Sequence, residues 1–112
     1  YAMALVTNGL SDLQRLKVSI SGLGPRFGAI IVSGEVGFGK PEPQAFQAAM
    51  QALGVGPEAA IMVGDSLERD VLGARAAGIP VVWVNRDGAT APPTATPDYE
   101  VADLRGLVEL LA

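Results

Sequence analysis

The stretch IMVGDSLERD, residues 61–70, contains the pattern that decides the fold class. Three apolar residues lead into Gly64 and Asp65, and a second aspartate, Asp70, follows five positions after the first. The apolar run predicts a buried strand, and the polar residues after the glycine predict a turn into a helix. Two carboxylates at such a junction can bind a metal ion, but they can equally cap the helix and complement its dipole.

Four short apolar runs predict the strands of a parallel sheet. They are YAMALV (1–6), AIIV (29–32), AAIMV (59–63) and VVWV (81–84). Each run is continuously apolar, which is typical of strands that are buried on both faces. The first run opens the chain without a methionine before it, which indicates that the sequence starts inside a longer protein.

Segments with the apolar spacing of helices follow these runs. Ser11 is a candidate N-cap of the first helix, and Pro43 and Gly54 mark the start and the end of the second. The apolar helix positions are Leu13, Leu16, Ile20 and Leu23; Phe46, Ala49 or Met50, and Leu53; Leu67, Val71, Ala74 and Gly78; and, within a last helix from Asp103 to Leu111, Leu104, Leu107, Val108 and Leu111. This alternation predicts an α/β sheet with right-handed crossovers, and the proline-rich segment 88–97 predicts a surface loop.

The composition excludes several classes of function. The chain has 112 residues, of which 49% are hydrophobic and 18% charged, as expected for one globular domain. A net charge of −4 argues against nucleic acid as the main partner. No apolar run approaches the ~20 residues of a membrane span, and the absence of cysteine makes a cytoplasmic setting the expectation. Without histidine or cysteine, Ser-His-Asp hydrolysis, Cys-His proteolysis and the usual zinc sites are excluded for this chain.

Polar turns follow three of the predicted strands. They are Thr7-Asn8-Gly9, Gly39-Lys40-Pro41-Glu42-Pro43 and Gly64-Asp65-Ser66. Ligands of an open parallel sheet bind beyond the carboxyl ends of its strands, so we expect the three turns to meet at one edge. The first turn offers a hydroxyl and backbone N–H groups to a phosphate, and Lys40, held between a glycine and a proline, offers a positive charge. Taken singly, a plain turn and a solvated lysine explain these two features as well.

The two aspartates of the third turn complete a possible phosphoryl-transfer site. Asp65 at the strand end and Asp70 in the first turns of the helix suit Mg²⁺, which binds a few carboxylates and keeps several waters. The alternative is that Asp65 or Ser66 caps the helix and Asp70 or Glu68 complements its dipole. Together, the hydroxyl, the lysine and the acid pair predict a site for phosphate and magnesium.

Three segments resemble known motifs. LVTNG, GKPEPQAF and MVGDSLERDVLGARAAG closely resemble the second, third and fourth signature motifs of the haloacid dehalogenase superfamily, in its phosphatase branch. The resemblance implies a Rossmann-like three-layer α/β/α fold with a mainly parallel sheet. It also implies Mg²⁺-dependent hydrolysis of a phosphomonoester of a small metabolite through an aspartyl-phosphate.

The resemblance also implies a role for each site residue. Thr7 donates a hydrogen bond to the phosphoryl group, helped by the backbone around Asn8, and Lys40 stabilises the charge on phosphate and nucleophile. Asp65 binds Mg²⁺ directly, and Asp70 supports the metal through water.

The first motif of the superfamily, DxDx[TV], is absent from this sequence. In the family its strand carries the nucleophile and lies between the strands that here end at Val6 and Val63; the cap domain that follows it is absent too. The other aspartates do not follow a strand in a DxD pattern: Asp12, Asp87, Asp98 and Asp103.

Residues 1–112 are therefore predicted to be the C-terminal part of a haloacid dehalogenase-like core domain, inactive alone. The alternative is a non-catalytic domain that binds phosphate or Mg²⁺, or that associates with itself by strand exchange through an open sheet.

Overall fold

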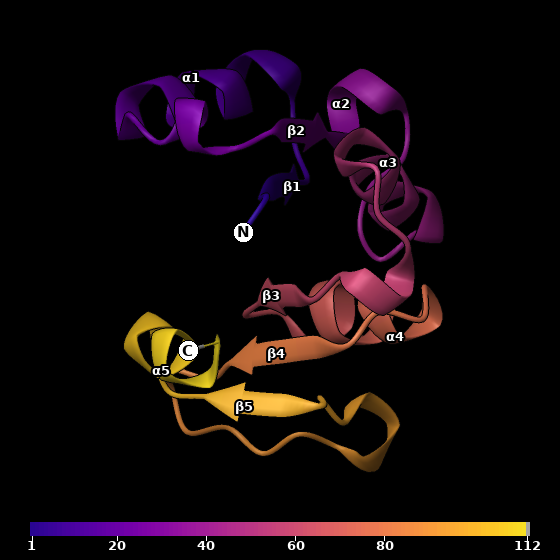
Figure 1. The fold of residues 1–112 in the computed structure, drawn as a ribbon, viewed down its shortest axis with the longest axis vertical. Helices are drawn as coiled ribbons and strands as arrows, with labels where there is room; N and C mark the ends of the chain where they lie inside the picture. Colours follow the sequence, from indigo (N-terminus) through magenta and orange to yellow (C-terminus); the bar gives the residue numbers. More distant parts are fainter. Residues whose placement is uncertain (112) are drawn as a thin grey trace. The chain divides into compact units, whose positions relative to one another are not determined.

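The computed structural model describes residues 1–111 and consists of helices and short parallel strands (Figure 1). The backbone forms two compact units, unit 1 (Tyr1–Gly56) and unit 2, which begins at Pro57. The predicted α/β class is confirmed.

The elements are given in chain order for each unit. Unit 1 contains β1 (Ala4–Thr7), α1 (Ser11–Ser21), η1 (Gly24–Arg26), β2 (Ala29–Val32), α2 (Ser33–Val36) and α3 (Pro43–Leu53). Unit 2 contains η2 (Pro57–Ala59), β3 (Met62–Gly64), η3 (Leu67–Leu72), α4 (Gly73–Ala76), β4 (Val81–Val84), η4 (Pro93–Ala95), β5 (Tyr99–Val101) and α5 (Leu104–Leu111).

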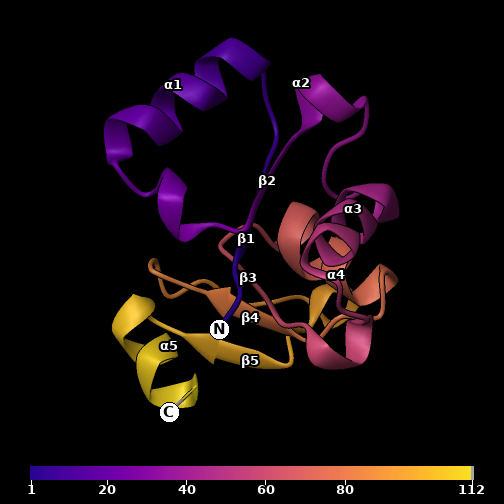
Figure 2. The same cartoon turned by 45° about the horizontal axis from the view of Figure 1, so that its top comes forward.

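Unit 1 is built on the parallel pair of β1 and β2, in which Ala4 lies opposite Ala29 and Thr7 opposite Val32. In both views α1 and α3 lie on opposite sides of this pair (Figures 1 and 2). Helix α3 packs on both strands and carries most of the buried side chains of the unit. As predicted, α3 begins with Pro43 in its first turn and ends before Gly54, which has the left-handed φ of 70° that glycine adopts easily.

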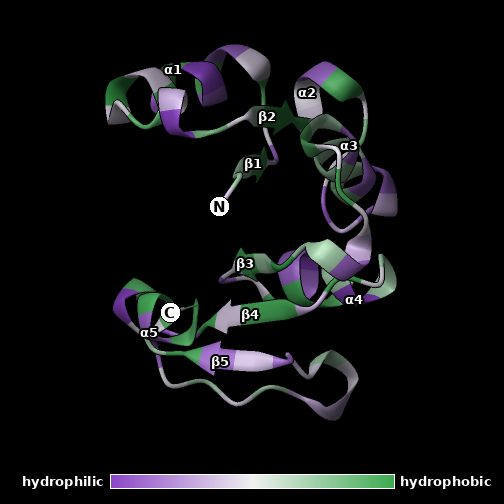
Figure 3. Ribbon diagram, viewed as in Figure 1, coloured by the Kyte–Doolittle hydropathy of each residue, from purple (hydrophilic) through white to green (hydrophobic). Residues whose placement is uncertain are grey.

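Unit 2 is built on a parallel sheet in the order β3-β4-β5. Helix η3, which continues into α4, packs against β3 and β4. All four residues of β4 are buried, and the strand is drawn largely in the green of hydrophobic residues (Figure 3). The core of this unit therefore lies around its central strand.

The prediction that every apolar run is buried on both faces is right for β4 and wrong for the others. The residues of β1 and β3 are all half-buried, and in β2 only Val32 is buried. Within residues 1–111, β1, β2 and β3 each pair with one strand, whereas β4 pairs with two. Edge strands keep part of their surface open, so a continuous apolar run does not imply full burial here.

Several local predictions need correction. Ser11 is not an N-cap: it is the first residue of α1, and Leu10 precedes the helix without a side-chain cap. The hydroxyl of Ser11 instead donates to Oε2 of Glu35 at 2.7 Å. Helix α2 and strand β5 were not predicted, since both are short and lack an apolar run. The helix expected after Ser66 begins as the π-helical η3, in which the N–H of Val71 donates to the Ser66 carbonyl at 3.1 Å.

Segment 88–97 is irregular, as predicted, apart from the short η4. Within residues 1–111 no helix has the length and apolar character that a membrane crossing needs.

Candidate active site

The Thr7 turn and the Lys40 loop are joined directly within unit 1. The side chain of Asn8 donates from Nδ2 to the Lys40 carbonyl at 2.8 Å, and its Oδ1 accepts from the Lys40 N–H at 2.9 Å. These two bonds hold the backbone of one loop against the side chain of the other, 32 positions away in the sequence. The prediction that the hydroxyl-bearing turn and the lysine lie together is therefore correct for unit 1.

This contact defines what Asn8 can offer to a phosphate. Its side-chain amide is engaged on both sides by the backbone of Lys40, so the role in anion binding that the resemblance implies here stays with the backbone around Asn8 as a prediction. Thr7 is half-buried, and its hydroxyl has no hydrogen-bond partner among residues 1–111. A half-buried hydroxyl of this kind is suited to donate to a phosphoryl oxygen.

Residues after β2 support the same turn and were missed by sequence reasoning. The N–H of Gly9 donates to Oγ of Ser33 at 2.8 Å, and the N–H of Gly34 donates to the Gly9 carbonyl at 3.0 Å. A Cβ at Gly34 would lie 2.7 Å from that carbonyl oxygen, and one at Gly39 would lie 2.9 Å from Oδ1 of Asn8. Glycine is therefore required at both positions for the loops to approach each other. The signal in the sequence is the Ser-Gly pair directly after AIIV.

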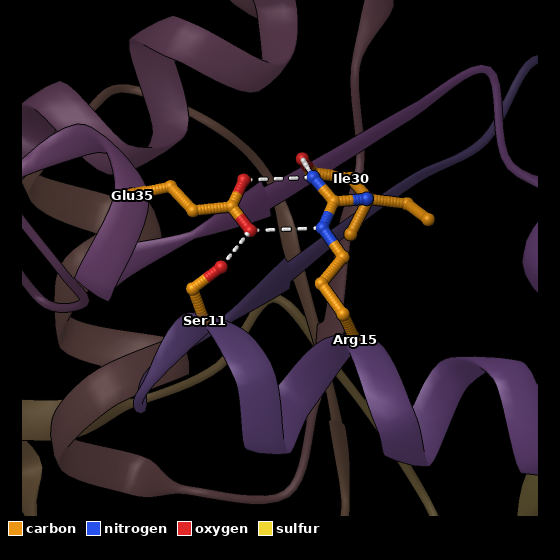
Figure 4. A network of polar contacts seen from close by, with 4 residues as sticks. All are labelled: Ser11, Arg15, Ile30 and Glu35. Atoms are coloured by element: carbon orange, nitrogen blue, oxygen red, sulfur yellow. Dashed lines mark hydrogen bonds and ion pairs between the residues drawn. The ribbon is translucent and has the colours of Figure 1, made fainter.

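A network of charged and polar side chains joins α1 to α2 (Figure 4). The guanidinium of Arg15 contacts both carboxylate oxygens of Glu35 at 2.8 Å, and Ser11 donates to the same carboxylate. The hydrogen bonds from Arg15 and then Ser11 lower the pKa of Glu35 from 4.5 to about 2. The same contact raises the pKa of Arg15. Arg15 also reaches the carbonyl of Ile30 in β2 at 3.5 Å, so the network connects three elements of unit 1.

An open pocket of about 500 Å³ lies beside the joined loops. Asn8, Ser33 and Lys40 line it together with Phe38 and Glu42. Of the three residues predicted to bind phosphate, Asn8 and Lys40 border this open pocket, whereas Thr7 does not line it.

The acid pair lies at the turn between β3 and η3 in unit 2. Asp70 is 3% exposed, and its Oδ2 accepts from the Ser66 N–H at 3.1 Å. Ser66 caps the helix, since its Oγ accepts from the Arg69 N–H at 3.1 Å. Of the two uses left open for this turn, capping is therefore correct for Ser66. Asp65 is exposed, and its carboxylate has no hydrogen-bond or ion-pair partner among residues 1–111.

Gly64 provides the space into which Asp70 fits. A Cβ added at Gly64 would overlap the side chain of Asp70, so only glycine allows the acid to lie against the end of β3. The two carboxylates offer the hard oxygen donors that Mg²⁺ prefers. Within residues 1–111 no three acidic side chains are arranged so that they alone could hold a metal ion. The donor chemistry of this pair suits an ion that completes its coordination with water and with oxygen atoms from outside these residues.

Comparison with known proteins decides the family. The family model of haloacid dehalogenase-like hydrolases matches residues 1–78. The chain belongs to this haloacid dehalogenase-like hydrolase family. The resemblance seen in the three sequence motifs is thereby confirmed.

Several relatives in the haloacid dehalogenase-like family are phosphatases. The chain is 52% identical over 104 residues to the phosphoserine phosphatase of Thermus thermophilus, covering 93% of this chain and 42% of that protein. A crystal structure of a haloacid dehalogenase phosphatase from Thermococcus onnurineus matches with a TM-score of 0.92 and 40% identity, covering 100% of this chain and 51% of that one.

The chain is also similar to a structure that was solved with bound magnesium. The Bacillus subtilis hydrolase YfnB, crystallised with magnesium, matches with a TM-score of 0.94 and 34% identity over 99% of this chain and 49% of that one. The chain thus spans about half the length of the relatives it matches.

Proposed function

We propose that residues 1–112 are the C-terminal part of the core domain of a Mg²⁺-dependent phosphatase, and that these residues contribute nothing to a cap domain. The phosphatase hydrolyses a phosphomonoester of a small metabolite through an aspartyl-phosphate. The observation that carries the proposal is the pair of hydrogen bonds between Asn8 and Lys40, which joins the turn that follows Thr7 to the lysine loop. The phosphatases among the relatives support it.

In the proposed reaction this chain binds and stabilises the phosphoryl group. Thr7 and the backbone around Asn8 donate hydrogen bonds to its oxygens, and Lys40 compensates their negative charge. Asp65 and Asp70 hold Mg²⁺, which supplies further positive charge when bound.

The nucleophile is an aspartate on a segment outside this sequence. Its oxygen attacks phosphorus, the P–O bond to the substrate breaks, and the alcohol leaves with a proton from a second, acid/base aspartate of that segment. Water then cleaves the aspartyl-phosphate, which releases inorganic phosphate and restores the carboxylate.

Phosphoserine is the first substrate to test, because the relative with 52% identity is a phosphoserine phosphatase. We expect the enzyme to act in the cytoplasm on small phosphorylated metabolites, and the net charge of −4 argues against a nucleic-acid partner.

The experiment combines this chain with the N-terminal part of a relative. The chain is co-expressed with the N-terminal part of the Thermus thermophilus phosphoserine phosphatase that it does not align with, and Mg²⁺-dependent release of phosphate from phosphoserine is measured. The matched control pairs that N-terminal part with the relative's own C-terminal part. We expect no turnover from the chain alone and turnover from the hybrid, reduced by about 10²- to 10³-fold in Lys40→Met. An active control pair beside an inactive hybrid, across phosphoserine and other small phosphate esters, contradicts the proposal.

A second candidate is a non-catalytic, self-associating domain. Within residues 1–111, β1 and β3 each pair with a single strand, and such open edges recruit further strands. This candidate predicts a dimer in sedimentation experiments that persists without Mg²⁺ or phosphate. A monomer that binds phosphate and Mg²⁺ excludes it.

A further inference from the structure

Trp83, the sole tryptophan of the chain, contacts the backbone of the acid turn. It lies in β4, opposite Gly64 of β3, and is 3% exposed. Its indole Nε1 donates to the carbonyl oxygen of Asp65 at 3.1 Å. The indole is therefore carried by the central strand of its sheet, all four residues of which are buried.

The peptide group between Asp65 and Ser66 is thereby held from both ends. Its carbonyl accepts from Trp83, and its N–H donates to the buried carboxylate of Asp70 at 3.1 Å. A peptide group is planar, so fixing both its oxygen and its hydrogen fixes its orientation. Asp65 stands directly before this peptide with an exposed carboxylate, and the direction of its side chain depends on that orientation.

We propose that Trp83 is a positioning residue for Asp65: its indole N–H fixes the peptide after Asp65 and so aims the exposed carboxylate. The part of this inference that concerns Mg²⁺ rests on the proposed function. The competing explanation is that the indole N–H finds the nearest acceptor, as a buried tryptophan must. In that case, loss of the indole N–H would affect packing and stability. It would change neither the local order of the Asp65 turn nor the affinity of that turn for a cation.

The test removes the N–H and keeps the ring. Trp83 is replaced by 3-benzothienylalanine, in which sulfur stands in place of the indole N–H, and by 5-fluorotryptophan, which retains the N–H, as the matched control. In the metal-free chain, amide exchange of Ser66 is compared with that of Val82 in β4, which reports on the stability of the sheet. We expect Ser66 to exchange about three- to tenfold faster in the benzothienyl variant, with Val82 changed much less.

The second readout is the affinity for Mg²⁺, followed through the amide shifts of Ser66 and Arg69. We expect affinity to fall by about three- to tenfold in the benzothienyl variant and to stay unchanged in the fluorinated control. Unchanged exchange at Ser66, or equal acceleration at Ser66 and Val82, overturns the inference whatever the metal does. Faster exchange at Ser66 in a chain that binds no Mg²⁺ supports the positioning role and overturns the magnesium site of the proposed function.

Discussion

The two groups of site residues are held by different kinds of contact. In unit 1, Asn8 and Lys40 are joined over 32 positions of sequence and Gly9 and Ser33 over 24. In unit 2, Asp70 and Ser66 are only four positions apart, and Trp83 contacts the same turn from a distance of 18 positions. The residues proposed to bind phosphate are thus joined by contacts between separate elements, whereas the hydrogen bond between Ser66 and Asp70 lies within one turn.

The two units also differ in the size of their hydrophobic cores, and unit 1 has the smaller one. In unit 1 the buried apolar residues are Val32, Ala45, Phe46 and Ala49, and helix α1 buries none of its residues. In unit 2 the whole of β4 is buried together with residues from the helices and loops around it. The geometry around Lys40 therefore rests on a small core with one large side chain, and mutations should disturb it more easily than the acid turn.

The largest effect is expected at Phe46 in unit 1. Phe46→Ala removes a side chain that is 2% exposed and should lower the free energy of unfolding of this unit by about 3–5 kcal/mol. Amide exchange of β2 residues measures this for unit 1 itself. Leu16→Ala, at a residue that is 55% exposed on α1, is the control and should change stability by no more than about 0.5 kcal/mol. Similar effects of the two variants would mean that α1 belongs to the core and that the contrast between the units is wrong.

A smaller loss is expected at Gly64 in unit 2. Gly64→Ala places a Cβ against Asp70 and should cost about 2–3 kcal/mol, since the buried acid must leave the end of β3. Urea unfolding followed by Trp83 fluorescence measures it. Asp70→Ala removes the carboxyl group that meets the new Cβ, so Gly64→Ala should cost less in that background, by about 1 kcal/mol. Strictly additive effects would mean that Gly64 is required for another reason.

Asn8 should show the next smaller effect. Asn8→Ala removes both bonds to the Lys40 backbone and should lower the stability of unit 1 by about 1–2 kcal/mol. Inorganic phosphate, titrated while the Lys40 amide is observed by NMR, should bind more weakly, because the lysine loop is no longer fixed. Gln51→Ala, at an exposed position of α3, is the control. Unaltered phosphate binding by Asn8→Ala would mean that the contact between Asn8 and Lys40 does not contribute to phosphate binding.

The contrast between local and distant contacts also explains what the sequence could predict. The bounds of β2, β4 and α3 were predictable, since apolar runs, a proline start and a glycine end are local signals. Strand β5 was not, because its residues Tyr99 and Glu100 are exposed and no apolar run marks them.

The same holds for the candidate site. The acids at 65 and 70 and the cap at Ser66 could be found from one short segment. The sequence also predicted that the Thr7 turn and the Lys40 loop meet, but not the two hydrogen bonds between Asn8 and Lys40 or the indole contact to Asp65, because each depends on how side chains pack between distant segments.

The smallest effect is expected at Glu35, in the network of Figure 4, and it depends on pH. The folded pKa of Glu35 is about 2 and its ordinary value is 4.5, so the unfolded chain binds more protons between these values. The contribution of Glu35 to stability is therefore complete above pH 4.5 and is lost as the pH falls through about 2. Glu35→Gln should be slightly less stable than the unaltered chain at pH 7, because an exposed ion pair contributes little, and the difference should disappear near pH 2. Urea midpoints at pH 7, 4 and 2 measure it, with Glu58→Gln on the exposed η2 as the control. A difference that persists at pH 2 would mean that the glutamate acts through packing and not through its charge, and unit 1 would then depend on even fewer polar contacts.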